Sequence, residues 1–243
     1  MKDYLLDIVK HTYSLGFISL VKVTGTDETT TIEGLAEDRS VILQATTKTP
    51  VADFMGTFGM PNLDKLGVIL RIPEYAENAN ISINTQERNG EQVPVGIAFS
   101  NASGDFKNDY RFMASEIINE KLKTVKMRAV NWGIEFEPSV ASIQRFKFMI
   151  SANSEETTFI AKTEGGDLKF YFGDHSTHAG SFDFAKGIAG ALKHAWSWPV
   201  AQVQAILGLD GKLTMKISDQ GAMQITVDSG LAEYNYILPA QSK

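Results

Sequence analysis

The residues best suited to metal chemistry are Asp174, His175 and His178, in the segment DHSTH. Carboxylate and imidazole groups are ligand types that bind zinc. Two histidines three positions apart, in a loop between expected strands, lack the further ligands that a firm site requires, and the chain has no cysteine to supply them. We therefore expect a solvated loop and no metal site here.

Two other patterns could indicate a chemical or nucleic-acid-binding site. The acidic pair Glu155 and Glu156 stands in a turn-like segment, where a solvated corner is favoured over acid–base catalysis. The run Arg145-Phe146-Lys147-Phe148 interleaves cations with aromatic rings, as a base-stacking surface would. Helical neighbours point about 100° apart, so Phe146 should face the core while Arg145 points elsewhere. The motifs GxxxxGK[ST] and HExxH are absent, and the sequence predicts neither an enzyme nor a cofactor.

The composition is that of an ordinary globular protein of one large domain or two smaller ones. The chain has 243 residues, of which 43% are hydrophobic and 21% charged, and its net charge is −6. A net negative charge argues against a simple basic DNA-binding protein, so any contact with nucleic acid must be local. The N-terminal segment MKDYLLDIVK lacks a secretory apolar run, and we expect a cytoplasmic location, in the host cell if the protein is viral.

An internal similarity favours two domains. Residues Pro50 to Gly59, PVADFMGTFG, are echoed by Pro199 to Gly208, PVAQVQAILG. Proline suits the first turn of a helix and glycine suits its end, so each copy is predicted to form a short capped helix.

The elements around these segments occur in the same order in both halves. In the first half, a helix capped by Asp3 runs to about Thr12, with Leu5, Ile8 and Val9 on one face. Strands are predicted before and after the first PVA segment, at FISLVKVT, TTTIEGLA, VILQATT, KLGVILRI, ANISINTQ, VPVGIAFS and DYRFMASEII.

The second half begins with a strand from Trp132 to Glu137 and a helix that starts at Ser139. Its apolar face is predicted to hold Val140, Ile143, Phe146 and Ile150. Strands then flank the second PVA helix, at TTFIAKT, DLKFYFG, AGSFDFA, KLTMKIS, AMQITVD and AEYNYILPA. The order predicts an α+β fold with two similar domains, each with two helices packed on antiparallel sheets, at residues 1–118 and 131–243, joined by a connector at 119–130.

This element order, the two PVA segments and the ending LAEYNYILPAQ resemble a DNA polymerase sliding clamp, especially the tailed-bacteriophage type. The resemblance implies a DNA-clamp fold in which six domains close into a ring around duplex DNA, as a homotrimer of two-domain chains. It also implies a processivity factor with no enzymatic activity. The implied partners are double-stranded DNA, contacted without sequence preference, a DNA polymerase, a clamp-loader ATPase and further copies of the chain.

A clamp needs cationic side chains on helix faces turned away from the sheets, because phosphates must be attracted without base readout. The candidate DNA-facing residues are Lys2, Lys10, His11, Arg145, Lys147 and Lys193. The alternative for each cation is a solvated position at the rim of an apolar helix face.

The resemblance also implies subunit contacts through two sheet edges, near Tyr110 to Ile117 and near Ala179 to Ala185. The candidate interface residues are Tyr110, Phe112, Ser181, Phe182 and Phe184. Ordinary pairing within one chain is the alternative for both strands.

Partner peptides would bind an apolar groove whose candidate residues are Val125, Met127, Ile237, Leu238 and Pro239. Ile237 and Leu238 are equally compatible with the core of the last strand. Two other function classes stay open: a viral structural or assembly protein built from a duplicated β-rich domain, and a small hydrolase, for which no convergent acids stand out.

Overall fold

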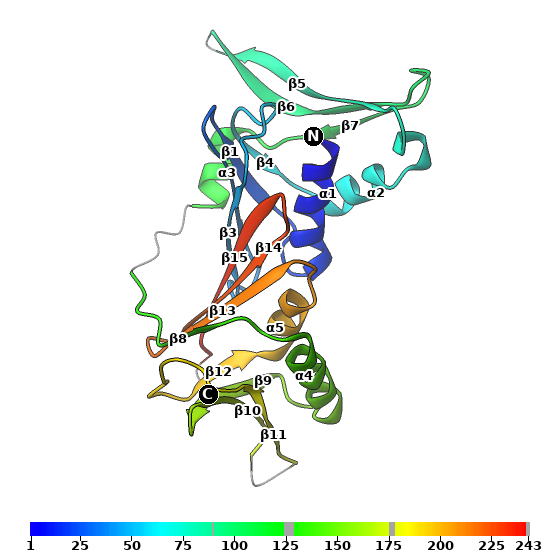
Figure 1. Cartoon of the computed structure of the whole chain (residues 1–243). Coiled ribbons are helices and arrows are strands. Elements are labelled where there is room, and N and C mark those ends of the chain that lie inside the picture. Colours follow the sequence, from blue (N-terminus) through cyan, green and yellow to red (C-terminus); the bar gives the residue numbers. More distant parts are fainter. Residues whose placement is uncertain (89, 124–128, 175–177, 242–243) are drawn as a thin grey trace. The chain divides into compact units, whose positions relative to one another are not determined.

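The chain forms two compact units (Figure 1). A computed structural model describes residues 1–88, 90–123, 129–174 and 178–241. Unit 1 takes its described residues from Met1–Val125 and Ser229–Tyr234, and unit 2 takes them from Lys126–Asp228 and Asn235–Lys243. The last strand, β15 (Ala232–Pro239), therefore has residues in both units. The domain limits expected from the sequence stay a prediction.

Unit 1 contains two groups of antiparallel strands. The first has the order β4-β1-β2-β3, formed by Gly56–Met60, Val21–Gly25, Thr30–Leu35 and Ile42–Thr47. The second has the order β5-β6-β7, formed by Asn80–Arg88, Glu91–Ser100 and Lys107–Arg111. Burial alternates along β2, where Thr30, Ile32 and Gly34 are buried, as expected for a strand with one face in the core.

The helices of unit 1 lie on both sides of the first sheet (Figure 1). Helix α1 (Lys2–His11) and helix α2 (Leu63–Leu70) lie on one side, and α3 (Ser115–Lys121) lies on the other. Two short 3-10 helices complete the unit, η1 (Tyr13–Leu15) and η2 (Pro73–Tyr75). Helix α1 confirms the predicted apolar face, since Leu5 and Ile8 are fully buried, although Asp3 lies in the first turn and does not cap it.

The prediction of a helix at Pro50–Gly59 is wrong. The residues turn at Val51–Phe54 and then form β4, which pairs with β1. Gly56 has a φ of 84°, which a helix interior does not accommodate. The carbonyl of Phe54 lies so close to Gly25 that a Cβ there would meet it at 1.5 Å, so glycine is required at that position.

The helix that follows, α2, occupies most of the sequence KLGVILRI, which was predicted to be a strand. Leu63, Leu66, Ile69 and Leu70 are buried at helical spacing. Gly67 permits close packing on α1, because a Cβ at this position would lie 3.1 Å from a methyl group of Val9. The predicted strand DYRFMASEII is likewise divided, since β7 ends at Arg111 and α3 begins at Ser115.

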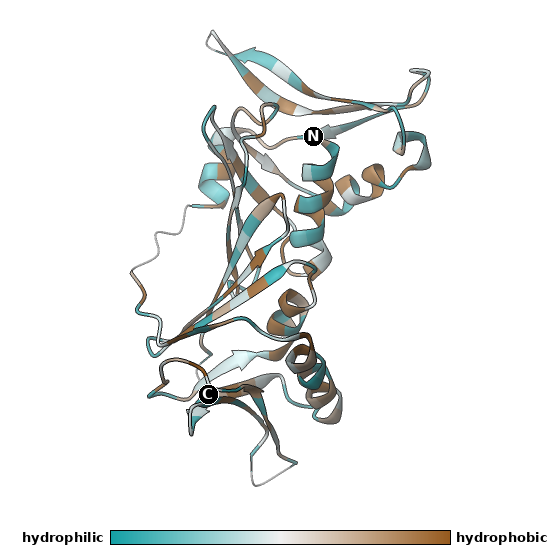
Figure 2. Cartoon of the chain, viewed as in Figure 1, coloured by the Kyte–Doolittle hydropathy of each residue, from teal (hydrophilic) through white to brown (hydrophobic). Residues whose placement is uncertain are grey.

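Unit 2 contains strands before, between and after two helices. One sheet has the order β11-β10-β9-β12, formed by Gly180–Ala185, Asp167–Phe172, Thr158–Glu164 and Trp196–Pro199. Three other strands pair in the order β14-β13-β8, formed by Ala222–Asp228, Lys212–Ser218 and Ile134–Phe136. Helix α5 (Val200–Leu207) confirms the second PVA helix, and in Figure 2 it is mainly hydrophobic.

Helix α4 (Val140–Ala152) anchors the aromatic core of unit 2. It begins where predicted, with the Ser139 hydroxyl accepting a hydrogen bond from the Ser142 amide at 3.0 Å. Phe146 is fully buried, and its ring contacts those of Phe159 and Phe170 at centroid distances of 5.1 and 5.6 Å. The edge-to-face geometry of these pairs fixes the helix on the sheet.

These features confirm the predicted α+β class, with antiparallel sheets and few helices. Of the helices that the structure describes, none has the length and apolar character needed to cross a membrane.

Candidate DNA-facing and assembly surfaces

The exposed side of α1 carries few charges. Asp3, Leu6 and Lys10 are exposed and follow one another at helical spacing. Lys2 instead bends toward η2, where its ammonium group donates hydrogen bonds to the carbonyls of Tyr75 and Ala76. Of the two lysines of α1 that were predicted to face DNA, Lys10 lies on the exposed face of the helix and Lys2 does not.

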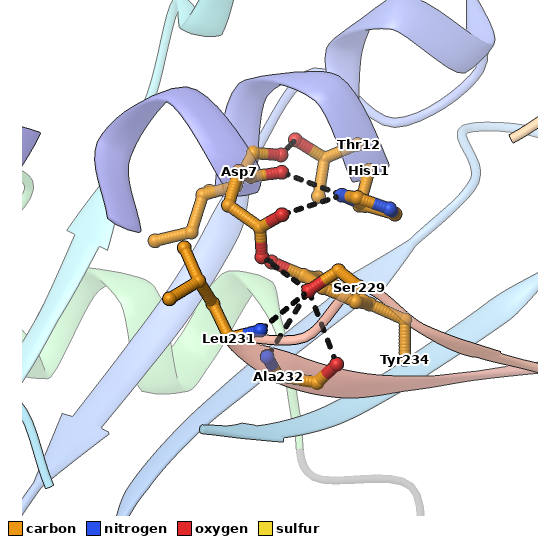
Figure 3. Close-up of polar contacts among 8 residues, drawn as sticks. Asp7, His11, Thr12, Ser229, Leu231, Ala232 and Tyr234 are labelled. Carbon is orange, nitrogen blue, oxygen red and sulfur yellow. Dashed lines mark hydrogen bonds and ion pairs between the residues drawn. The ribbon is translucent and has the colours of Figure 1, made fainter. Parts of the chain in front are cut away.

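His11 is not a DNA-facing residue, which corrects the prediction. Its side chain is only 1% exposed and its ring stacks on that of Tyr234, with the ring centroids 4.3 Å apart. Its Nδ1 atom lies 2.9 Å from the main-chain oxygen of Asp7 and 3.2 Å from the Asp7 carboxylate (Figure 3). The imidazole is thus part of the interior of unit 1.

The Asp7 carboxylate is the centre of this polar cluster (Figure 3). It accepts hydrogen bonds from the hydroxyls of Ser229 and Tyr234, at 2.9 and 2.8 Å. Burial raises the pKa of Asp7, but hydrogen bonds with His11, Tyr234 and Ser229 and the charge interaction with His11 outweigh it and hold the pKa below its ordinary value. The cluster joins α1 to the segment Ser229–Tyr234, far away in the sequence but part of the same unit.

The missed helix α2 adds cations that the sequence analysis did not select. Lys65 is exposed in its first turn, beside Asp64. Arg71 follows the last turn, and its Nε donates to the carbonyl of Gly67 at 3.0 Å. The spacing of the buried leucines after Asn62 was the signal that would have identified this helix.

The two predicted cations of α4 differ in their surroundings. The Arg145 guanidinium donates to the main-chain oxygen of Asp183 at 3.1 Å and lies 5.3 Å from the centroid of the Phe182 ring. Arg145 is thereby held against β11. Lys147 is half-buried and forms no ion pair with any described residue.

Lys193 lies in the segment between β11 and β12, which Figure 1 shows apart from α4 and α5. The amides of Lys193 and His194 donate to the Asp219 carboxylate at 2.7 and 3.0 Å. These bonds fix the segment, so the structure does not bring Lys193 together with Lys147.

The two strands expected at subunit contacts both lie at sheet edges. β7 is the last strand in the order β5-β6-β7, and β11 is the first in β11-β10-β9-β12. An edge strand presents unpaired amide and carbonyl groups to a further strand. Any pairing with another copy of the chain stays a prediction.

The candidate interface side chains point mostly inward. Tyr110 is buried, and its hydroxyl donates to the carbonyl of Pro61; burial, with a contribution from Asp64, raises the pKa of this phenol. Phe112 stacks on the ring of Phe58, with centroids 4.2 Å apart. Phe182 and Phe184 are buried in unit 2, whereas Ser181 is exposed. These aromatic rings therefore stabilise each unit.

Exposed apolar side chains lie on the two helices that pack against the edge strands, and they were not among the predicted interface residues. Val68 on α2, which packs against β7, is 57% exposed. On α4, which packs against β11, Phe148 is 69% exposed. Val140 is 79% exposed, so its predicted place on the buried face of α4 is wrong.

The predicted peptide groove is described only in part. Val125 and Met127 lie outside the described residues. Ile237 and Leu238 are buried, and Pro239 is exposed. The burial of Ile237 and Leu238 agrees with the core alternative, and Pro239 is the candidate whose side chain is accessible.

The structure gives no support to a metal site. Among the described residues, no group of three or more His, Cys, Asp or Glu side chains is arranged to hold an ion. Of the DHSTH segment, Asp174 and His178 are exposed and His175 lies outside the described part of the chain.

Comparison with known proteins shows similarity of structure but not of sequence. No family model matches the chain, and no curated protein matches it. The structure of A. fulgidus PCNA bound to the C-terminal region of FEN-1 matches with a TM-score of 0.70 at 10% sequence identity, over 100% of this chain and 97% of that one. PCNA from Thermococcus kodakaraensis matches with a TM-score of 0.69 at 9% identity, over 98% of this chain and 97% of that one. The chain therefore has the DNA-clamp fold, along its whole length.

Proposed function

We propose that this protein is a sliding clamp, a ring of several copies that encircles duplex DNA and tethers a replicative DNA polymerase. The observation that carries this proposal is the likeness to PCNA, which extends over the whole chain at a TM-score of 0.70. A clamp acts by topology, so the proposal needs no catalytic group. We retain the tailed-bacteriophage type as part of the proposal.

The ring would form by head-to-tail pairing of β7 in one copy with β11 in the next. Repeated pairing of two different edges gives a closed ring when the rotation between copies is right. Burial of Val68 and Phe148 beside the paired strands would add apolar contact area to the main-chain hydrogen bonds. Three copies of a 26.7 kDa chain give a homotrimer of about 80 kDa.

The contact with DNA would be weak and electrostatic. Lys10, Lys65 and Lys147 place positive charge on α1, α2 and α4, in a chain whose net charge is −6. Lysine attracts phosphates without reading bases, so the ring could move along the duplex. We expect Lys147→Glu to reduce the rate of threading onto DNA ends severalfold at low salt. Lys193→Glu, a matched charge change away from the helices, should have little effect.

The other proposed partners are a DNA polymerase and a clamp-loader ATPase. The PCNA structure with the C-terminal region of FEN-1 supports a site for partner segments on this fold. In this chain we place the site near the last strand, with Pro239 as its accessible apolar residue.

The function can be tested without a loader. The protein is threaded onto linear duplex DNA, both ends are then blocked with bound streptavidin, and the DNA is washed at high salt. Screening removes electrostatic binding but leaves a topological link intact. We expect the protein to stay on the DNA until one end is cut, and to be absent when the ends are blocked first. Release during the high-salt wash would contradict encirclement.

A further inference from the structure

A cavity of about 550 Å³ in unit 1 lies between the distal part of the β5–β6 hairpin, the end of β7 and the first turn of α3. Figure 1 shows these elements in the upper part of the picture. Its volume falls within the range of about 300–1,000 Å³ that is usual for ligand sites. The surfaces discussed above for DNA and partner peptides do not use this cavity, but two of its lining residues, Arg111 of β7 and Phe112, belong to the segment proposed to contact another copy.

The cavity is positively charged. Arg88 from β5 and Arg111 from β7 both line it, and Glu116 from α3 is the one carboxylate among its described lining residues. Both arginines are exposed, and neither guanidinium group forms an ion pair or a hydrogen bond with a described residue. Two guanidinium groups without an acceptor among the described side chains are well suited to bind carboxylates, because their planar donor pairs match the two carboxylate oxygens.

The cavity also has an apolar part. Val93 and Val95 on β6 are half-buried, and the ring of Phe112 beside them is held in place by stacking on Phe58. A small inorganic anion would use the arginines and leave these side chains uncovered. A peptide with an acidic residue beside an apolar residue would use both.

We propose that this cavity binds an extended segment of a partner protein that carries carboxylates next to aliphatic side chains. The carboxylates pair with Arg88 and Arg111, and an aliphatic side chain contacts Val93, Val95 and Phe112. Glu116 opposes the negative ligand and lowers its affinity. The inference concerns unit 1 alone, since every described lining residue belongs to that unit.

The probe is the capped peptide Ser-Leu-Glu-Ile-Asp-Ser, compared by calorimetry with its amide counterpart Ser-Leu-Gln-Ile-Asn-Ser on the full chain. We expect the acidic peptide to bind more tightly. Arg88→Gln and Arg111→Gln should each weaken it about tenfold, since each removes a charge-assisted hydrogen bond. Lys107→Gln removes an exposed charge of β7 outside the cavity and is the matched control.

Glu116→Gln provides a test of opposite sign. It should tighten binding of the acidic peptide about threefold and leave the amide peptide unchanged. A change in folding cannot imitate this gain.

Several results would overturn the proposal. Equal affinity for the two peptides, or no binding of either, removes the carboxylate recognition. Displacement of the peptide by an equal concentration of inorganic phosphate identifies a simple anion site. A fall in native mass of the double variant Arg88→Gln, Arg111→Gln identifies the cavity as a contact between copies of this chain. The peptide and phosphate results do not bear on the DNA-threading assay, which tests the clamp itself, whereas a variant of lower native mass should also thread less onto DNA.

Discussion

Replacing Asp7 by Ala should selectively destabilise unit 1. The Asp7 side chain is 10% exposed, and its carboxylate accepts from Tyr234 and Ser229 while lying 3.2 Å from His11. A hydrogen bond to a charged group contributes about 1.5–3 kcal/mol. Ser229 keeps its bonds to the Ala232 backbone, and His11 keeps the main-chain oxygen of Asp7. We therefore expect a loss of about 2–4 kcal/mol, less than three full bonds.

The assay should separate the two units. The three tryptophans, Trp132, Trp196 and Trp198, all belong to unit 2, so their fluorescence reports its unfolding. Amide hydrogen exchange in α1 reports the opening of unit 1. Asp7→Ala should accelerate exchange in α1 and leave the fluorescence transition nearly unchanged.

The pH dependence has a defined sign. The folded-state pKa of Asp7 lies below its ordinary value, so its contribution is present above about pH 4 and is lost as the pH falls through the folded-state pKa. The difference in stability between the wild type and Asp7→Asn should therefore shrink under acidic conditions.

Two results would refute this account of the Asp7 cluster. One is a cost below about 0.5 kcal/mol for Asp7→Ala, which is the size of an ordinary surface substitution. The other is a stability difference that does not depend on pH. Tyr234→Phe is the partner for a double-mutant cycle, in which we expect a coupling of about 1–2 kcal/mol with Asp7.

Three other predictions concern assembly and unit 2. The double variant Val68→Glu, Phe148→Glu should convert the assembly to monomers in sedimentation, because each substitution places a charge beside a paired edge. Leu6→Glu on α1 is the control and should leave the assembly intact. If the control dissociates the assembly as much as the double variant does, the proposed assembly surface is contradicted. Ser139→Ala should lower the stability of unit 2 by about 1 kcal/mol in urea unfolding, through loss of the α4 cap, and an unchanged midpoint would count against that cap. Phe146→Ala should cost about 3–5 kcal/mol by leaving a cavity among the aromatic rings, and a cost below 1 kcal/mol would mean that the ring is not central to the core.

The two PVA segments show where local sequence reasoning succeeded and where it failed. At matching positions, Ala205 and Ile206 in the second segment continue a helix, whereas Gly56 and Thr57 in the first begin the strand β4. The helix of the first half, α2, lies immediately afterwards. The two segments share their first and last residues, but the residues between these ends determine whether a helix or a strand forms. The short sequence match therefore did not reveal the difference in structure.

Tertiary contacts decided the remaining differences. Lys10 and His11 are neighbours in sequence, but helical geometry turns one to solvent and the other into the Asp7 cluster. The partner of that cluster, Ser229–Tyr234, lies at the other end of the chain, and no local pattern in α1 indicates it. In contrast, the start of α4 at Ser139 followed from a capping signal, which is a local property. The edge positions of β7 and β11 were implied by the resemblance, not by a local pattern.

The native mass in solution tests the proposed ring most directly. Sedimentation equilibrium at physiological salt should give about 80 kDa, three times the 26.7 kDa of the chain. This mass is that of three copies joined by pairing of β7 with β11 and closed into a ring. A stable monomer of 26.7 kDa at all accessible concentrations would contradict it.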